Sequence, residues 1–562
     1  MMSMNKIWET SYPDTLKNYQ FEPELLTETA AKIIKNSVQH YLLQPAFTVV
    51  LPNGFSHTLS YQQVDHLSDA FACYLKHELH LKQGDVVGIQ LPNGLHYPIA
   101  VFGIWKAGLI VTNINPLYTA KELGDQLKDC KAKLLIASDL FVQNAMDVVD
   151  ELNINLMVAN MKDFFQFPVG LMIDIQRTKE TIVPDILYQT FNHALTEGQK
   201  TLEQFLPVEH PVALYQYTGG TTGKSKGAVI YHSNLLAVIK MAQDMLQAYS
   251  ERFAIQPGDT ILTALPMYHI FAFNFNFLLF FSQGGHNILI PNPRPLENLE
   301  KAFQKFDVNW ITGVDTLFAG LLQQEWFIQH PPRLKLAISG GTSLRQSTAQ
   351  AWKKQISTIV EGYGMTESSC FVSVNPPLDH PLIGSVGLPL PASELKIVDE
   401  HGKTLGVGQA GELWVKGPHI IEQYLNRPEE NETSFDNGWF KTGDIATMDA
   451  QGFLTIVDRK KDLIIVSGFN VYPNEVEDVI SGHPEVIEVA VIGCPDEASG
   501  ESVRAFVVTK NKNLTQQELI AFCRKSLTNY KVPKQIEFRE QLPKSAVGKI
   551  LRAQLRHEMG KA

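Results

Sequence analysis

The feature of this sequence that most limits its fold is a repeated alternation of short apolar runs with helical patterns. The run VVGIQL begins at Val86 and precedes a helical stretch from Tyr97 to Lys106, and GLIVTNIN and a second helix near Lys121 to Cys130 follow. Further apolar runs are LLIAS, ALYQY, ILTAL, HNILI and WITGV. Such alternation is typical of parallel strands joined by crossover helices. The sequence therefore predicts an α/β fold in which parallel or mixed sheets are covered by helices.

The pattern changes near residue 457, where strand-rich sequence ends in the charged run DRKKD, residues 458–462. The rest of the chain reads helix, strand, strand, helix, strand (NEVEDVISGH, EVAVIG, VRAFVVT, TQQELIAFCRKSL, QIEFR), which is the pattern of one small α+β domain. A chain of 562 residues is also too long for a single hydrophobic core. We therefore expect an N-terminal domain over residues 1–457, a hinge over 458–463 and a small mobile domain over 464–562. An ordinary solvated loop is the alternative interpretation of the charged run, but its place between two complete patterns favours a linker.

Charge and cysteine content exclude several classes of protein. The formal net charge of −11 argues against a nucleic-acid partner, which would need a basic face. The five cysteines are scattered and form no CxxC pair, which argues against a disulfide framework or a zinc site. The N-terminal residues show no signal peptide, and the most apolar stretch, Ile270 to Phe281, is too short to span a membrane. We therefore expect a cytoplasmic protein.

The strongest local signal for chemistry is the segment YTGGTTGKSKG, residues 217–227, which follows the run ALYQY. Backbone N–H groups of a glycine-rich loop, together with hydroxyl and ammonium groups, can surround phosphate oxygens. The letters GKS resemble the end of a Walker A loop, but Thr218 stands where that motif needs glycine. A plain glycine-rich turn would not need so many hydroxyls and lysines. The segment therefore predicts a phosphate-binding loop.

Three later segments carry further polar groups. EGYGMTE ends at Glu367, and a fixed carboxylate is what Mg²⁺ bound to ATP requires. WFKTGD ends at Asp444 and is followed by Arg459; a carboxylate can accept both ribose hydroxyls while an arginine donates to the same sugar. PKSAVGK, which ends at Lys549, would by itself be only a polar turn.

Taken in this order, the segments resemble the motifs of the adenylate-forming superfamily: YTGGTTGKSKG, LPMYHIFAF, EGYGMTE, WFKTGD, DRKKD, SGFNVYPNEVE and PKSAVGK. The chain is most similar to bacterial long-chain fatty acid–CoA ligases, through INPLYTAKEL, ITGVDTLF, SVNPPLDH, VDRKKDLIIVSGFNVYPNEVEDVI and NYKVPKQIEF. The resemblance runs from about residue 10 to 556 and is weakest over 140–205. It implies a magnesium-dependent ligase of lipid metabolism. Such a ligase converts a fatty acid and ATP into acyl-AMP and pyrophosphate, and then transfers the acyl group to CoA with release of AMP.

The resemblance also implies roles for individual residues. Thr218 and Glu367 would hold Mg²⁺, Lys549 would be the adenylation lysine, and His269 would lie beside the reacting carboxylate. The expected nucleotide-binding residues are Tyr217, Thr218, Gly219, Gly220, Thr221, Thr222, Gly223, Lys226, Gly340, Gly341, Tyr363, Gly364, Met365, Thr366, Asp444, Arg459 and Lys549. The expected acyl-binding residues are His269, Phe273, Gly313 and Val314. Lys461 would be the hinge about which the small domain rotates to present Gly468 to CoA.

Two positions depart from the family pattern. Thr342 stands where the family has a third glycine, which alters the local shape of the acyl pocket, and Lys224 replaces a usually apolar residue of the loop. Gly313, which has no side chain, would leave depth for a long apolar tail, or would serve backbone geometry alone.

Several alternatives stay open at this stage. A relative acting on medium-chain or aryl acids, or loading a carrier protein, would share the same motifs. A P-loop NTPase or a non-catalytic acyl-binding protein fits less well, because of Thr218 in the first case and the retained Lys549 and Glu367 in the second. The apolar run FFQFPVGLMI from Phe164 either makes reversible contact with the inner face of the membrane or packs on its own domain. The oligomeric state is open, a homodimer included.

Overall fold

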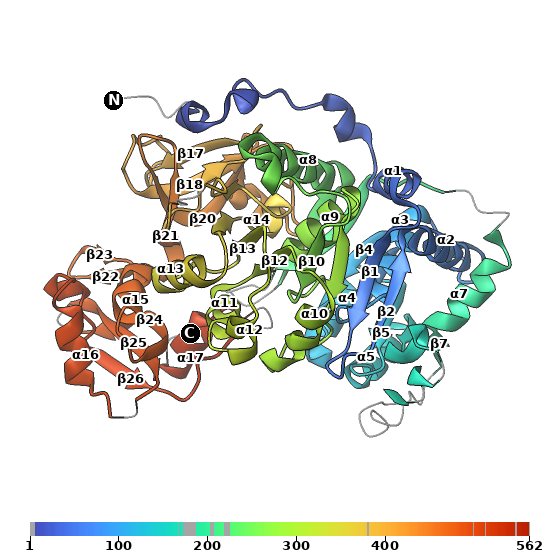
Figure 1. Ribbon diagram of the computed structural model, residues 1–562. Helices are drawn as coiled ribbons and strands as arrows, with labels where there is room; N and C mark the ends of the chain where they lie inside the picture. Colours follow the sequence, from blue (N-terminus) through green and yellow to red (C-terminus); the bar gives the residue numbers. More distant parts are fainter. Residues whose placement is uncertain are drawn as a thin grey trace.

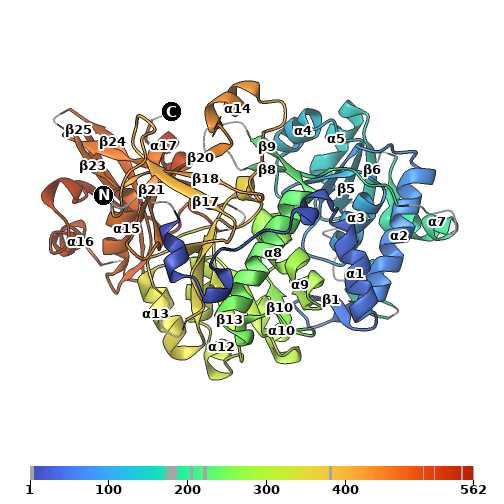
Figure 2. The same ribbon diagram turned by 90° about the horizontal axis from the view of Figure 1, so that it is seen from above.

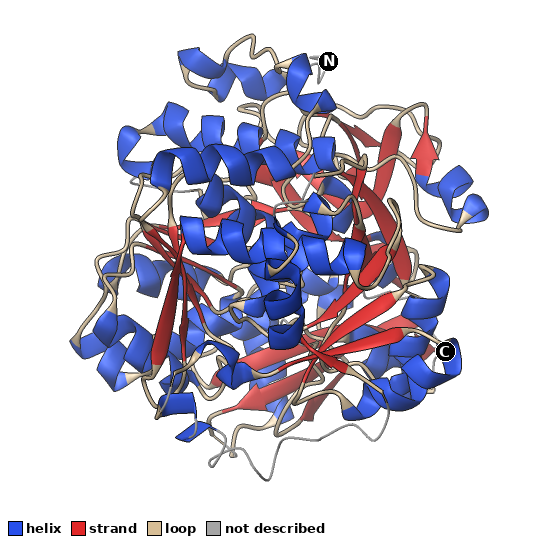
Figure 3. Cartoon of the chain, turned by 90° about the vertical axis from the view of Figure 1, so that its right-hand side faces the viewer, coloured by secondary structure: helices blue, strands red, loops and turns tan. Residues whose placement is uncertain are grey.

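In the part of the chain that the computed structural model describes, four β-sheets and their covering helices make up the fold (Figure 1). The structure describes residues 6–166, 168–170, 172–173, 187–202, 207–218, 225–378, 382–497, 499–511, 513–545 and 548–560. Helices lie over the sheets and between them (Figure 3). The α/β fold class predicted from the sequence is thereby confirmed.

The first large sheet has seven strands in the order β7-β6-β5-β3-β4-β8-β9. Neighbouring strands are parallel, except that β8 and β9 form an antiparallel hairpin at one edge. Its strands are β3 (Val86–Gln90), β4 (Ile110–Asn113), β5 (Leu134–Ser138), β6 (Asn155–Ala159), β7 (Gln189–Thr190), β8 (Val212–Thr218) and β9 (Lys226–Tyr231).

The second large sheet has nine strands in the order β16-β15-β14-β13-β12-β10-β11-β1-β2. The strands from β1 to β14 along this order are parallel, and the strands at both edges are antiparallel. Its strands are β1 (Pro45–Val50), β2 (Ser56–Ser60), β10 (Thr260–Thr263), β11 (His286–Leu289), β12 (Trp310–Gly313), β13 (Leu336–Ser339), β14 (Ile359–Tyr363), β15 (Ser373–Val374) and β16 (Leu388–Pro389).

The helices of this part of the chain are α1 (Ala31–Tyr41), α2 (Tyr61–His77), α3 (His96–Lys106), α4 (Ala120–Asp129), α5 (Gln143–Leu152), α7 (Phe191–Gln199), α8 (His232–Tyr249), α9 (Phe280–Ser282), α10 (Glu300–Lys305), α11 (Asp315–Leu321), α12 (Glu325–Gln329), α13 (Gln346–Gln355) and α14 (Pro428–Ser434). Every residue of α3 is buried, which explains why its sequence is apolar on all sides. Its Lys106 is neutralised by two carboxylates, since its Nζ lies 2.6 Å from Asp65 Oδ1 and 2.7 Å from Asp69 Oδ1.

Short 3-10 segments include η1 (Ile7–Ser11), η2 (Asp14–Leu16), η3 (Pro23–Thr27), η4 (Met161–Phe164), η9 (Thr366–Ser368) and η10 (Lys460–Asp462).

Two smaller sheets follow. The third contains β17 (Glu394–Val398), β18 (Gly411–Lys416), β19 (Phe435–Asp436), β20 (Trp439–Met448) and β21 (Leu454–Arg459), all antiparallel. The fourth contains β22 (Ile464–Val466), β23 (Phe469–Val471), β24 (Val486–Asp496), β25 (Gly500–Thr509) and β26 (Gln535–Phe538), with helices α15 (Pro473–Ser481), α16 (Gln516–Cys523) and α17 (Arg552–Glu558). The fourth sheet and its helices lie at one end of the molecule (Figures 1 and 2) and have a separate hydrophobic core that includes Ile464, Val491 and Leu519.

The charged run predicted to be a hinge is partly strand. Asp458 and Arg459 are the last residues of β21, and the Asp458 carboxylate is buried and accepts the backbone N–H of Asn474 at 2.8 Å. Only residues 460–463 lie between β21 and β22, and three of them form η10. The domain boundaries and the mobility of the C-terminal domain stay predictions.

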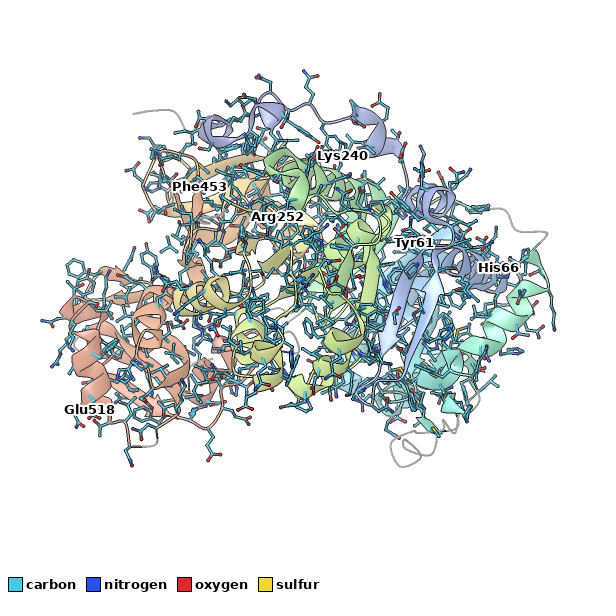
Figure 4. The ribbon with its side chains drawn as sticks, in the orientation of Figure 1. Tyr61, His66, Lys240, Arg252, Phe453 and Glu518 are labelled. Carbon is cyan, nitrogen blue, oxygen red and sulfur yellow. The ribbon has the colours of Figure 1, made fainter. Side chains whose placement is uncertain are left out.

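The N-terminal segment, η1 to η3, crosses over α8 (Figure 1). The Tyr19 hydroxyl donates to Asp244 Oδ2 at 2.7 Å, and the ammonium of Lys240 donates to the same carboxylate at 2.8 Å. Lys240 lies on α8 below this segment (Figure 4). The contact fastens the start of the chain to the outer side of α8.

The apolar run from Phe164 packs on the fold where the structure describes it. The Phe164 ring lies 4.7 Å from that of His96 and 6.4 Å from that of His57, and the His96 imidazole contacts Asp163 Oδ2 at 3.0 Å. Met172, further along the run, is exposed. Within this run, residues 167 and 171 lie outside the described part of the chain. Among the residues described, no helix is long and apolar enough to cross a membrane.

Candidate active site

One cavity of about 2010 Å³ opens between the N-terminal part of the chain and the C-terminal α+β unit. The predicted site residues that line it are Tyr217, Thr218, Lys226, His269, Val314, Gly340, Gly341, Tyr363, Gly364, Met365, Thr366, Glu367, Asp444, Arg459, Lys461 and Lys549. Gly219, Gly220, Thr221, Thr222, Gly223 and Lys224 lie outside the described residues. Phe273, Gly313 and Gly468 are described but do not line this cavity.

The hairpin of β8 and β9 holds the two ends of the glycine-rich segment together. Thr218 pairs with Lys226 across the hairpin, and the Ser225 hydroxyl donates to the Thr218 carbonyl. The Tyr217 hydroxyl donates to Asp129 Oδ2 on α4 at 2.7 Å. Thr218 and Lys226 are thus brought side by side at the rim of the cavity.

Glu367 follows β14 in the short segment η9. The chain turns so tightly here that a Cβ on Gly364 would lie 1.7 Å from the carbonyl oxygen of Cys370, which is why glycine is required. Glu367 Oε1 accepts the Tyr424 hydroxyl at 2.6 Å. Its Oε2 accepts no hydrogen bond from the residues that the structure describes. Glu367 and Thr218 both line the cavity, and a carboxylate oxygen is the kind of ligand that a magnesium ion prefers.

Asp444 and Arg459 face each other across β20 and β21. Arg459 Nε contacts Asp444 Oδ1 at 2.6 Å, and the Tyr363 hydroxyl donates to Asp444 Oδ2 at 2.5 Å. Burial and the Asp444 carboxylate raise the pKa of Tyr363 well above its ordinary value. Both carboxylate oxygens therefore have protein donors, and a ribose would share or replace them.

Lys549 reaches the cavity from the C-terminal unit. Gly548 lies so close to the N-terminal part that a Cβ on it would be 3.2 Å from the Thr316 hydroxyl and 3.4 Å from Val314 Cγ2. The pKa of Lys549 is lowered to about 8. Desolvation is the largest cause, and the positive charge of the nearby Arg459 guanidinium is the second. The side chain still contacts solvent, so the desolvation comes from the cavity walls and not from complete burial.

The His269 side chain is uncharged in this setting. Desolvation and, after it, the Lys549 ammonium lower the pKa of His269 to about 4. A neutral imidazole near a cationic lysine can donate or accept a hydrogen bond at the carboxylate of a substrate without adding charge.

Two cavity residues had no assigned role at the sequence level. Burial raises the pKa of Glu361 to about 8, and its Oε1 accepts the backbone N–H of Leu344 at 2.9 Å. Glu361 opens the EGYGMTE segment, so a signal for it was present. Tyr424 lies in the segment IEQYLN, which carries no recognisable chemical pattern.

The residues expected along an acyl tunnel are packed differently. Phe273 is fully buried, with its ring 6.0 Å from that of Trp105 and 5.6 Å from that of Phe277. A Cβ on Gly313 would lie 2.8 Å from Leu317 Cδ2 and 3.1 Å from the ring of Phe318, so the space beside it is filled. The Thr342 hydroxyl, by contrast, is beside the cavity, is buried and finds no partner among the described residues.

Gly468 occupies the turn between β22 and β23 and is exposed. Its φ of +84° is one that glycine adopts without strain. The turn does not contribute to the cavity, so its expected contact with CoA would need another orientation of the C-terminal unit.

Comparison with known proteins agrees with this geometry. The family model described as AMP-binding enzyme matches residues 36–425, and the AMP-binding enzyme C-terminal domain matches residues 475–549. The chain belongs to the AMP-binding enzyme family. This AMP-binding enzyme is 42% identical to a long-chain-fatty-acid–CoA ligase of Escherichia coli O6:H1, over 99% of the chain and 98% of the relative. It is 34% identical to a protein of the same name in Bacillus subtilis, over 99% of each.

Solved structures of other proteins share the fold. The anthranilate CoA ligase AuaEII in complex with anthranoyl-AMP aligns with a TM-score of 0.83 at 26% identity, covering 95% of this AMP-binding enzyme and 97% of that chain. ATP-bound MatB from Rhodopseudomonas palustris aligns with a TM-score of 0.80 at 26% identity, covering 94% and 99%.

Proposed function

We propose that this AMP-binding enzyme is a long-chain fatty acid–CoA ligase. It joins a fatty acid to CoA in two steps, with ATP and CoA as co-substrates and acyl-AMP as the intermediate. The observation that carries the proposal is the single cavity that collects Thr218, Glu367, the Asp444–Arg459 pair and Lys549 from distant parts of the chain. Likeness to long-chain-fatty-acid–CoA ligases over nearly the whole length supports the choice of substrate.

The nucleotide would be held by groups along one side of the cavity. The rim formed by Thr218 and Lys226 would receive the phosphates, and Asp444 and Arg459 would bind the ribose hydroxyls. The remaining expected contacts with the base and phosphates would be Tyr217, Gly219 to Gly223, Gly340, Gly341 and the segment from Tyr363 to Thr366. Thr218 and Glu367 would hold Mg²⁺, whose positive charge offsets the phosphate charge.

The first step brings two anions together. The fatty carboxylate attacks the α-phosphorus of ATP, the new C–O–P bond forms, and the bond to pyrophosphate breaks. The ammonium of Lys549 would lie beside the bridging oxygens and stabilise the charge that develops there. Neutral His269 would orient the carboxylate without repelling Lys549 or attracting the carboxylate away from phosphorus.

The second step needs a different face of the C-terminal unit. A rotation within residues 458–463, with Lys461 as the pivot, would withdraw Lys549 and bring the Gly468 turn to the cavity. The CoA thiolate then attacks the acyl carbonyl, a tetrahedral centre forms and collapses, and AMP leaves with the electrons of the C–O bond.

The filled space beside Gly313 favours a second candidate: a ligase of medium-chain or aryl acids on the same fold, with a shorter pocket beside Val314. An AMP-release assay with saturated acids from C6 to C18 and with benzoate separates the two. We expect the highest kcat/KM at C14 to C18. A maximum at C8 or at benzoate would establish the second candidate, and ADP as product would contradict both.

Membrane contact is a finer part of the proposal. We expect reversible binding at the cytoplasmic face of the membrane, where an insoluble acid would be collected, through the apolar run that contains exposed Met172. Met172→Glu should reduce co-sedimentation with anionic lipid vesicles, while Met172→Leu should not. Equal binding by both variants would show that the run serves packing alone. Sedimentation velocity distinguishes a monomer from a homodimer.

A further inference from the structure

A short segment, residues 420–425, joins the phosphate rim to Glu367. On one side it pairs with β9: Leu425 N donates to the Gly227 carbonyl at 2.7 Å, and Val229 N donates to the Gln423 carbonyl at 3.1 Å. On the other side, Ile421 N donates to the Glu367 carbonyl at 2.9 Å. The segment therefore ties the strand after the glycine-rich loop to the backbone of the acidic motif.

Tyr424 adds a side-chain contact to these backbone contacts. Its hydroxyl donates to Glu367 Oε1 at 2.6 Å, and only 5% of the residue is exposed. Its backbone is fixed twice by Asn431, which accepts the Tyr424 N–H at 2.7 Å and donates to the Tyr424 carbonyl at 3.0 Å. The hydroxyl is thus held at a defined point relative to β9.

Lys226 connects the same ring to the phosphate rim. Its ammonium lies 5.4 Å from the centre of the Tyr424 ring, within the range of a cation–π contact. One aromatic side chain therefore touches both the lysine and the carboxylate that the nucleotide would meet. The Tyr424 hydroxyl occupies Glu367 Oε1, and no described residue donates a hydrogen bond to Oε2, the oxygen that could meet a cation.

We propose that Tyr424 is a positioning residue for Glu367, which orients the carboxylate so that Oε2 meets the magnesium ion of bound ATP. This inference rests on the proposed function, because it takes Mg²⁺–ATP as the ligand. An unrestrained glutamate would distribute its carboxylate over several rotamers and would meet the metal in only some of them. Hydrogen-bond partners of metal ligands typically change metal affinity by about 10- to 100-fold.

The test is Tyr424→Phe, which keeps the ring, the contact with Lys226 and the packing, and removes only the hydroxyl. Electron paramagnetic resonance of free Mn²⁺ gives the metal affinity of the enzyme–ATP complex, and calorimetry gives ATP affinity with EDTA present. We expect Mn²⁺ affinity to fall about tenfold or more and metal-free ATP affinity to stay within twofold. Tyr19→Phe is the matched control, since it removes the same tyrosine–carboxylate hydrogen bond, to Asp244, outside the cavity lining.

A double-mutant cycle separates positioning from general damage. In a Glu367→Gln background, Tyr424→Phe should cause no further loss of Mn²⁺ affinity. Equal losses of ATP affinity with and without metal, or an unchanged Mn²⁺ affinity, would overturn the positioning role. Failure of the wild-type enzyme–ATP complex to bind Mn²⁺ would overturn it as well. Acid selectivity, measured separately by AMP release, tests the proposed function, because neither metal measurement contains a fatty acid.

Discussion

The pKa of Lys549 lies close to the pH at which such an enzyme would work. It is lowered from 10.5 to about 8, and only the protonated amine can stabilise the charge on the bridging oxygens. We therefore expect kcat/KM for acyl-AMP formation to fall as the pH rises through about 8. Lys549→Arg should remove this alkaline fall, because a guanidinium stays charged. An identical fall in the arginine variant would assign the titration to another group.

A neutral side chain at the same position separates the two half-reactions. Lys549→Met should lower the rate of acyl-AMP formation by about 100-fold or more, the usual effect of losing one group that stabilises a transition state. Thioester formation from supplied acyl-AMP should change far less, since the proposed rotation would withdraw Lys549 before that step. Pyrophosphate exchange and thioester assays measure the two steps. Equal losses in both, with the melting temperature unchanged, would refute the role of Lys549.

At the level of elements, the junction of β12 and α11 tests the acyl pocket. Leu317 and Phe318 fill the space that a side chain on Gly313 would need, and overpacking of this kind costs about 1–3 kcal/mol. We therefore expect Gly313→Leu to lower the melting temperature and to reduce activity on C8 and C16 acids alike. A selective loss at C16 would instead place Gly313 on a tunnel wall that opens only with substrate bound.

The segment η10 is the element on which domain rotation would depend. Proline at Lys461 fixes φ and restricts the preceding residue, so Lys461→Pro should hinder the rotation. We expect near-normal acyl-AMP formation and slow thioester release. Lys461→Ala, which leaves φ free, is the control. Unchanged overall turnover in the proline variant would count against rotation about this residue.

Local sequence predicted the elements of the site far better than the contacts between them. The loop that joins β8 to β9 and the turn at Gly364 are marked by glycines within a few residues, and such signals are readable along the chain. The acyl-binding role of Phe273 was implied by the resemblance and stays a prediction, because Phe273 packs against Trp105 and Phe277 and does not line the cavity. Local sequence also gives no sign that the segment Ala272–Leu279 is a π-helix.

Tyr424 shows that sequence patterns did not predict the long-range contacts of the site. Its hydrogen bond to Glu367 joins residues that are 57 positions apart, and no motif near either residue indicates the other. The hinge shows a similar limit, because DRKKD is a charged run of the kind found in linkers, yet Asp458 is buried. Its carboxylate is kept in place by the backbone of Asn474 and the nearby guanidinium of Arg552, which no local pattern reveals.

At the scale of the whole molecule, the two parts of the chain meet around the cavity through a few polar contacts. Arg345, at the start of α13, donates from Nε to Asp315 Oδ2 at 2.6 Å and from Nη1 to the carbonyl of Ile487 at 2.7 Å. Ile487 belongs to β24 of the C-terminal unit. Arg345 is thus a bridge between the two parts in the arrangement that presents Lys549.

Loss of this bridge should shift the balance between the two arrangements. Arg345→Gln keeps a polar side chain but leaves the buried Asp315 carboxylate without its charged partner, so we expect acyl-AMP formation to fall several-fold. Thioester formation from supplied acyl-AMP should hold or rise, because the opposing arrangement does not need the contact. Arg333→Gln, an exposed arginine on the same part of the chain, is the control. Pyrophosphate exchange and single-turnover thioester assays measure the two rates. A proportional fall in both, at an unchanged melting temperature, would show that Arg345 shapes the cavity and does not select the arrangement.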